Sequence, residues 1–282
     1  MSPTRMRNLL TELQGARVLL ARSRSPSDTA IHGARQHVKR ARAILRLLSS
    51  AVGLKTYRQL NLALRDVNRV LRQARDRAVI MQTLESIGVR KPHMKPASLR
   101  IQAFWRRHRG DGRAPAVPSI DRRAALAGLA RATAAVHKCR LAPKREHSAL
   151  AAIRSSYRKA QKAYRHASRT GSQANWHECR KQTKYLYYQL QFTKVRPLKR
   201  PRAIHEARVL GSVLGKERDL ALLAAELERT GVDRSAAGGA MLLRVDHRRA
   251  RLQRKCAAHG ARLFRDKASA FARGLQANRV AQ

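Results

Sequence analysis

The sequence predicts an all-α protein made of two four-helix bundles that arose by internal duplication. Three observations lead to this prediction. Apolar residues recur about every 3.6 positions along nearly the whole chain, and convincing strand alternation is absent. A histidine-led pattern of basic residues also occurs twice, beginning at His32 and again at His177. The length of 282 residues suits one large domain or two moderate ones.

Residues typical of turns separate the predicted helices. Nine helices are expected, covering residues 5–22, 29–51, 56–87, 97–108, 121–140, 147–169, 173–193, 202–230 and 236–275. Before the second helix, the stretch Ser25–Asp28 contains a proline and offers Asp28 as the N-cap. The segment 109–119 is a flexible connector rich in glycine and proline. Pro197 and Pro201 end the seventh helix, because proline cannot continue the helical hydrogen-bond ladder.

The two repeats are expected to meet between Gly110 and Ser148. We place the first repeat at residues 1–119 and the second at residues 120–282. Each repeat then forms a four-helix unit. The natural architecture of such a duplicated unit is a pair of antiparallel helical bundles packed side by side.

Two predicted helices carry the repeated basic pattern, at offsets of three, four, seven and eight residues from the histidine. The first copy is His32, Arg35, Gln36, Lys39 and Arg40, and the second is His177, Arg180, Lys181, Lys184 and Tyr185. At about 100° per residue these positions share an arc of about 140°. The opposite, apolar positions are Ile31, Ala34, Val38, Ala41 and Leu45, matched by Trp176, Cys179, Thr183, Leu186 and Leu190. A solvated face is the ordinary interpretation of one basic helix, but the duplication favours a face that binds anions.

Three further helices carry rows of basic side chains. The rows are Arg58, Arg65, Arg69 and Arg72; Arg154, Arg158, Lys162, Arg165 and Arg169; and Arg244, Arg248, Arg251, Lys255, His259 and Arg262. Like charges three or four residues apart destabilise a helix by a few tenths of a kcal/mol per pair. A bound chain of phosphates would offset this cost, and plain solvent exposure is the equal alternative for each row taken alone.

The charge of the chain points to a polyanionic partner. Lysine and arginine total 62 against 17 acidic residues, a formal net charge of +45, while 43% of residues are hydrophobic and can bury a core. A compact chain with this charge needs counter-charge from salt or from a polyanion. The candidates are DNA, RNA, an anionic membrane surface and inorganic polyphosphate.

Other features limit what the protein does. Cys139, Cys179 and Cys256 are few and far apart, so we expect no disulfide framework, no zinc site and a reducing compartment. No apolar signal core opens the chain and no run of 18 apolar residues occurs in it. We therefore expect a cytoplasmic protein with no cofactor, no metal and no membrane span.

A second repeated feature pairs an arginine with an aspartate, as Arg65-Asp66 in the first half and Arg218-Asp219 in the second. Asp66 and Asp219 are expected to form structural ion pairs that orient neighbouring arginines. No second carboxylate lies nearby for general acid–base catalysis, and no P-loop or acidic cluster is present to hold Mg²⁺. The sequence therefore predicts a protein that is not an enzyme.

Several stretches share their spacing with a known family. They are His32, Arg35, Lys39, Arg40 and Arg42; His177, Arg180 and Lys184; Leu214–Leu220; and Leu263–Phe271. Together they resemble the CHAD family, the conserved-histidine α-helical domain, over about residues 9–275. The resemblance implies two four-helix bundles related by pseudo-twofold symmetry. It also implies that the basic motif helices line a central groove or pore that binds inorganic polyphosphate, often at cytoplasmic polyphosphate granules.

The chain departs from the family pattern at a few positions. Tyr185 and Tyr187 stand where basic residues are usual, which predicts fewer phosphate contacts from the second motif helix. Leu62 and Ala63 replace the Leu-Gly found at the matching turn of the second half. Some CHAD proteins carry a catalytic domain marked by a Glu-x-Glu-x-Lys strand. Here the nearest string, Glu226–Glu228, lies in a helical segment without the lysine.

With the charge, this resemblance predicts non-catalytic binding of inorganic polyphosphate. The expected binding residues are His32, Arg35, Lys39, Arg40, Arg42, Arg65, Arg158, Lys162, His177, Arg180, Lys181, Lys184, Arg218, Arg248 and Arg251. The alternative is a non-specific nucleic-acid-binding protein of the nucleoid or of RNA. Aromatic residues, at 4%, leave few stacking platforms for single strands. An enzyme of phosphate transfer is the third and least favoured class.

Overall fold

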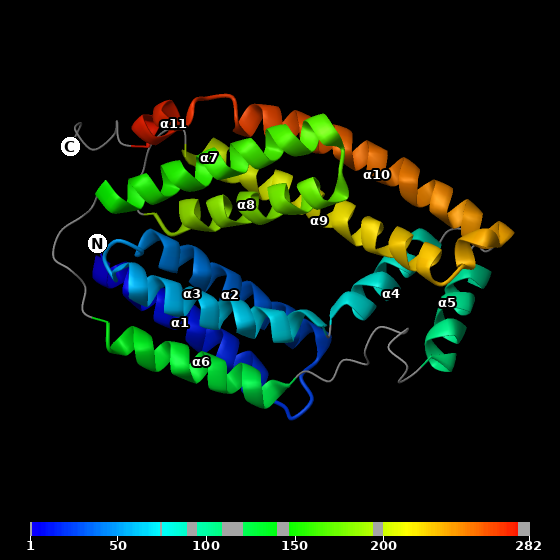
Figure 1. Ribbon diagram of the computed structural model, residues 1–282, viewed down its shortest axis with the longest axis horizontal. Helices are drawn as coiled ribbons and strands as arrows, with labels where there is room; N and C mark the ends of the chain where they lie inside the picture. The colour runs from blue at the N-terminus through cyan, green and yellow to red at the C-terminus, as the bar shows by residue number, and fades with distance from the viewer. Residues whose placement is uncertain are drawn as a thin grey trace.

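The structure is a computed structural model that describes residues 2–73, 75–88, 95–108, 121–139, 147–193 and 200–275. All regular secondary structure in these ranges is helical, which confirms the predicted all-α fold. The helices gather into two groups of four, and two further helices lie at one end of the molecule (Figure 1).

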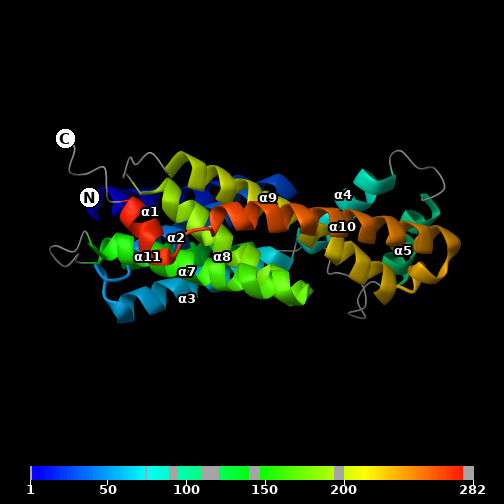
Figure 2. The ribbon, with the colours of Figure 1, turned by 90° about the horizontal axis from the view of Figure 1, so that it is seen from above.

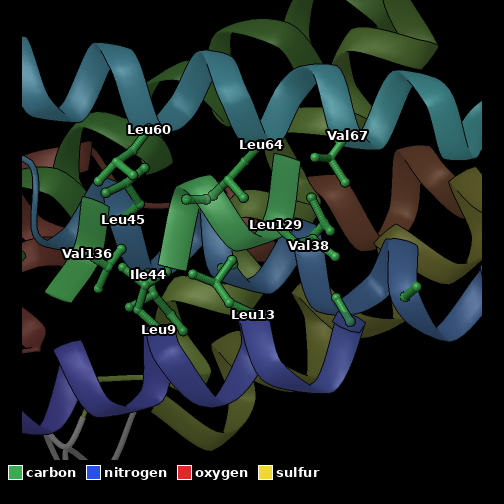
Figure 3. Close-up of a cluster of buried hydrophobic side chains, with 14 of the residues drawn as sticks. Leu9, Leu13, Val38, Ile44, Leu45, Leu60, Leu64, Val67, Leu129 and Val136 are labelled. Atoms are coloured by element: carbon green, nitrogen blue, oxygen red, sulfur yellow. The ribbon is translucent and has the colours of Figure 1, made fainter. Parts of the chain in front are cut away.

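The first group of helices surrounds a single hydrophobic core. Its members are α1 (Ser2–Ala21), α2 (Asp28–Leu47), α3 (Leu54–Gln73) and α6 (Arg122–His137). Figure 3 shows Leu13 of α1, Ile44 of α2, Leu64 of α3 and Leu129 of α6 pointing toward one another. Each of these side chains is at most 1% exposed. Burial of a side chain of this size contributes about 1.5–3 kcal/mol, so this core holds the four helices together.

The second group has a core of its own. Its members are α7 (His147–Thr170), α8 (Gln173–Gln191), α9 (Arg200–Arg229) and α10 (Ala236–Leu263), and the short α11 (Ala268–Gly274) packs on α7. Tyr157 of α7 is fully buried, and its hydroxyl donates to the Asp266 carbonyl at 2.9 Å. Its ring also stacks on Phe271 of α11, with centroids 4.0 Å apart. Tyr157 thus holds α11 against the second group of helices.

A third core lies where α9 and α10 extend beyond the rest of their group. There α4 (Arg75–Gly88) and α5 (Lys95–Arg107) pack against the far ends of α9 and α10, as Figure 2 shows. Trp105 of α5 is fully buried, and its indole N–H donates to Glu226 of α9 at 2.5 Å. A short 3₁₀ turn, Val232–Arg234, joins α9 to α10 at the tip.

Some predicted element boundaries differ from those of the structure. The helix predicted at 56–87 corresponds to α3 and α4 on either side of residue 74, and α4 packs mainly on α9 rather than on the first group. The helix predicted at 236–275 is also two, α10 and α11. The prediction of Asp28 as an N-cap was wrong. Ser27 caps α2 instead, and its hydroxyl accepts from the Ala30 N–H at 3.2 Å.

The packing also bears on where the two repeats meet. α6 belongs to the first group, although the second repeat was expected to begin at residue 120. It packs there because it buries Leu129, Ala132 and Val136 against α1 and α3. α4 and α5, which fall in the expected first repeat, pack mainly against the second group. The duplication itself stays a prediction.

Candidate functional site

The two helices with the repeated basic pattern, α2 and α8, pack directly against each other between the two groups. They run in the same direction, as the course of the chain in Figure 1 shows. The apolar positions predicted for both helices are all buried inside their own groups, which confirms that part of the prediction. The basic faces are therefore directed away from the two cores.

A small apolar cluster lies at the contact between α2 and α8. It consists of Ala43 of α2 with Tyr185 and Tyr188 of α8. Ala43 is fully buried and each tyrosine is only 6% exposed. The small side chain at residue 43 leaves room for the two rings, so the helices can approach closely at this point.

Two arginines of α2 lie over the Tyr185 ring. The guanidinium carbon of Arg46 is 3.7 Å from the ring centroid, and that of Arg42 is 5.6 Å away. Arg42 also donates from Nε to the Asn61 amide oxygen of α3 at 3.1 Å. Burial lowers the pKa of Arg42, and the positive charges of Arg46 and Arg65 lower it further. The ring face attracts these cations, so Tyr185 keeps two like charges close together.

On the other side of the cluster, cations of both helices come together. The guanidinium carbon of Arg40 lies 5.9 Å from the Tyr188 centroid, and the Lys184 ammonium lies 5.6 Å from that of Tyr187. Burial lowers the pKa of Lys184, and the positive charges of Arg180 and Arg40 lower it further. A lysine of α8 is thus close to an arginine of α2. We call Arg40, Arg42 and Arg46 of α2, with Arg180 and Lys184 of α8, the basic interface.

Two glycines of α9 make room for the α8 cations. A Cβ atom at Gly211 would lie 3.0 Å from Cε of Lys184, and one at Gly215 would lie 3.6 Å from a terminal nitrogen of Arg180. Because α9 has no side chain at these two successive turns, Lys184 and Arg180 can lie across its backbone. The Arg180 guanidinium and the end of the Lys184 side chain therefore lie against the α9 backbone.

Comparison with known proteins settles the family. A family model described as "CHAD domain" matches residues 4–228, most of the chain. The chain belongs to the CHAD domain family. The structure is similar to one titled "Crystal structure of the CHAD domain from the plant Ricinus communis", with a TM-score of 0.53 and 20% identity over 98% of this chain and 91% of that chain. No curated protein matches the chain.

The histidines of the two motifs sit near the beginnings of their helices in this CHAD domain. Nε2 of His32 lies 2.5 Å from the side-chain nitrogen of Gln36, one turn further along α2. His32 and His177 are both half-buried, as are the predicted binding residues Arg35 and Lys39. The histidines therefore belong to the same half-buried helix faces as the basic interface, toward the N-terminal ends.

Several other predicted binding residues lie elsewhere in the CHAD domain. Arg158 and Lys162 are exposed on α7, and Lys162 lines a hollow of about 740 Å³ between α7 and α8. Arg248 of α10 donates to the Ser86 carbonyl of α4 at 3.5 Å. Burial lowers the pKa of Arg248, as does the charge of Arg244. Arg251 is exposed on α10.

The remaining predicted residues make local contacts. Lys181 pairs with Glu178, one turn earlier on α8. Asp66 lies 3.7 Å from Nε of Arg65 and 3.6 Å from a terminal nitrogen of Arg69, and its side chain is 42% exposed. Ion pairs this exposed contribute at most about 1 kcal/mol. Arg218 and Asp219 are half-buried on α9.

The sequence reasoning missed three residues at the basic interface. Arg46 follows His32 by fourteen positions, so the same helical period that gave the motif would have placed it on the same face. Tyr188 carried no signal, because its role depends on a contact between helices far apart in the sequence. Glu12 of α1 lies 4.0 Å from Arg40, and nothing in the local pattern marks it.

Two further findings concern other kinds of site. Among the described residues, no group of three or more histidines, cysteines, aspartates and glutamates is placed to hold a metal ion. No described helix has the length and apolar character needed to cross a membrane.

Proposed function

We propose that this CHAD protein binds inorganic polyphosphate through the basic interface, without catalysing a reaction on it. One observation carries the proposal: the two motif helices contact each other, so cations of α2 and α8 crowd around one small apolar cluster. Family membership supports it, since polyphosphate binding is a general property of CHAD domains. Binding at cytoplasmic polyphosphate granules is part of the same proposal.

The charge arrangement gives the physical reason. Lys184 loses favourable solvation and lies near Arg180 and Arg40, so the free protein carries an electrostatic cost at this place. A linear phosphate chain would supply one negative charge per inner phosphate along the row of cations. Guanidinium groups bind phosphate oxygens in pairs, and lysine acts as a point charge. A bound phosphate chain would therefore offset the repulsion between these cations, because each cation would then lie next to a negative charge.

The buried tyrosines weigh against nucleic acid as the preferred ligand. Proteins that bind single strands offer exposed aromatic faces for base stacking. Here Tyr185 and Tyr188 are 6% exposed, and arginines of α2 lie over their rings. These two rings are therefore not exposed for base stacking, whereas the cations beside them suit phosphates.

A competition assay separates polyphosphate from nucleic acid. Unlabelled long-chain polyphosphate should displace labelled polyphosphate at a total phosphate concentration about tenfold below that needed for single-stranded or duplex DNA, a difference of about 1.4 kcal/mol. Fluorescence anisotropy at one fixed salt concentration measures both curves. DNA that competes equally well per phosphate would contradict the proposal. Phosphate release from polyphosphate by the pure protein with Mg²⁺ or Mn²⁺ would contradict the non-catalytic role.

The lowered pKa of Lys184 predicts that binding is coupled to proton uptake. Bound phosphates favour the ammonium form, so they should raise this pKa toward its ordinary value. Affinity should then fall as the pH rises from the lowered pKa of the free protein to the higher pKa of the complex. Calorimetry at alkaline pH, in buffers with different ionisation enthalpies, measures the uptake.

The control for this coupling is Lys184→Arg, which keeps the charge but does not lose its proton in this range. It should abolish the alkaline proton uptake while still binding polyphosphate. Equal uptake by this variant and the natural protein would assign the proton to another group.

A further inference from the structure

One carboxylate lies beside the basic interface in a chain that has few acids. Glu12 of α1 is 8% exposed, and its Oε2 lies 2.7 Å from Nδ1 of His37 on α2. The same oxygen lies 4.0 Å from a terminal nitrogen of Arg40. Glu12 thus meets α2 at two successive turns, through a histidine and an arginine.

The packing of α1 on α2 shapes this contact. Gly15 follows Glu12 by three residues on α1, and a Cβ atom there would lie 2.6 Å from Cε1 of His37. Any larger residue at this position would displace the ring. The glycine therefore lets the His37 imidazole lie against α1 with Nδ1 directed at the Glu12 carboxylate.

Arg40 is held between Glu12 and α8. Its guanidinium carbon lies 5.9 Å from the Tyr188 centroid, and one of its terminal nitrogens lies 4.0 Å from the Glu12 carboxylate. Burial raises the pKa of Tyr188, the charges of Arg40 and Arg180 lower it, and the charge of Glu12 raises it. All three charged groups therefore act on the same ring. Without the carboxylate, Arg40 would lose the negative charge that Glu12 supplies close to Lys184 and Arg180.

We propose that Glu12, oriented by His37, is a positioning residue that keeps Arg40 at the basic interface and so strengthens polyphosphate binding. This inference rests on the proposed function. The direction of the effect on affinity separates this role from general electrostatics. If only the net charge mattered, removal of an acid would tighten the binding of a polyanion. If Glu12 positions Arg40, its removal weakens that binding.

The second group of helices supplies a matched control. Glu206 of α9 is also 8% exposed; its carboxylate accepts from Nδ1 of His259 at 2.8 Å and from Nε of Arg262 at 3.1 Å. The histidine and arginine are three residues apart on α10, as His37 and Arg40 are on α2. Glu206 faces a small hollow beside α11, lined by Phe271 among others, and not the basic interface.

The test compares Glu12→Gln with Glu206→Gln, since each removes one buried carboxylate and raises the net charge by one. Glu12→Gln should weaken the affinity for long-chain polyphosphate by about threefold to tenfold, in the range of coupled neighbouring residues. Glu206→Gln should change it less than about twofold. In an Arg40→Gln background, Glu12→Gln should cause no further loss. Unchanged or tighter binding by Glu12→Gln, or a loss that persists without Arg40, would overturn the proposal.

A second measurement does not depend on the ligand. In the free protein, Glu12→Gln should shift the Nε–Hε resonance of Arg40 in NMR spectra, and Glu206→Gln should leave it unchanged. An Arg40 signal unmoved by Glu12→Gln would overturn the positioning role. Failure of the natural protein to bind polyphosphate would instead refute the proposed function. If Glu12→Gln does not fold, His37→Leu keeps the carboxylate, removes its hydrogen bond to the ring and should also shift the Arg40 resonance, with a smaller loss of affinity.

Discussion

Replacing Arg180 and Lys184 together by glutamine should lower the affinity for long-chain polyphosphate about a hundredfold. Both side chains lie at the basic interface, where burial and the charges of Arg180 and Arg40 lower the pKa of Lys184. A hydrogen bond to a charged group contributes about 1.5–3 kcal/mol, so the loss of two such contacts corresponds to a factor of about 10² or more. Fluorescence anisotropy at fixed salt measures the affinity, and circular dichroism checks that the helices are retained.

The control removes the same charge from a distant surface. Arg123 and Arg131 are exposed on α6, which packs against α1 and α3 and not against α8. Their replacement by glutamine should weaken binding less than about threefold, the effect expected of long-range charge alone. If both double variants lost the same amount of affinity, binding would depend only on the overall positive charge of the protein. In cells, the Arg180 and Lys184 variant should also lose its localisation to polyphosphate granules, while the α6 variant should keep it.

Raising the salt concentration from 50 to 200 mM should weaken polyphosphate binding about 10³-fold. The estimate assumes about six phosphate contacts and the counterion release known for other polyanions. The logarithm of the binding constant should fall linearly with the logarithm of the salt concentration. Titrations at four or five NaCl concentrations give the slope.

The slope of this salt dependence also shows which residues contact phosphate. Each lost cation–phosphate contact should reduce the slope by about 0.7–0.9, so the Arg180 and Lys184 variant should have a slope shallower by about 1.4–1.8. The α6 variant should keep the natural slope. A slope that does not change in the first variant would show that these two residues do not contact phosphate.

Local chemistry was predictable from the sequence, and packing was not. The helical period correctly divided α2 and α8 into apolar and basic faces, since Val38 and Leu186 are fully buried while Arg40 and Lys184 are not. The period cannot tell which helix a face will meet. The period therefore could not show that 122–137 packs against α1 and α3, or that 75–88 packs against α9.

The candidate site shows the same limit. Arg248 was predicted from its row on the helix, and the row gave no sign that its terminal nitrogen would lie 3.5 Å from the Ser86 carbonyl of α4. Tyr185 was interpreted as a lost cation of the second motif. In the structure its ring lies beneath Arg46 and Arg42 of the other motif helix, so it supports basic residues that it does not itself provide. Such a role depends on a neighbour about 140 residues away, which no local pattern contains.

The tyrosines of α8 also explain why the two motif helices differ. Arg40 and Tyr185 each follow their histidine by eight residues, and Ala43 and Tyr188 each follow by eleven. Two identical copies of the first helix would place arginine against arginine at this contact, and two copies of the second would lack the arginines Arg40, Arg42 and Arg46. The two motif helices are therefore complementary where they meet: α2 brings Arg42 and Arg46, and α8 brings the aromatic ring over which they lie.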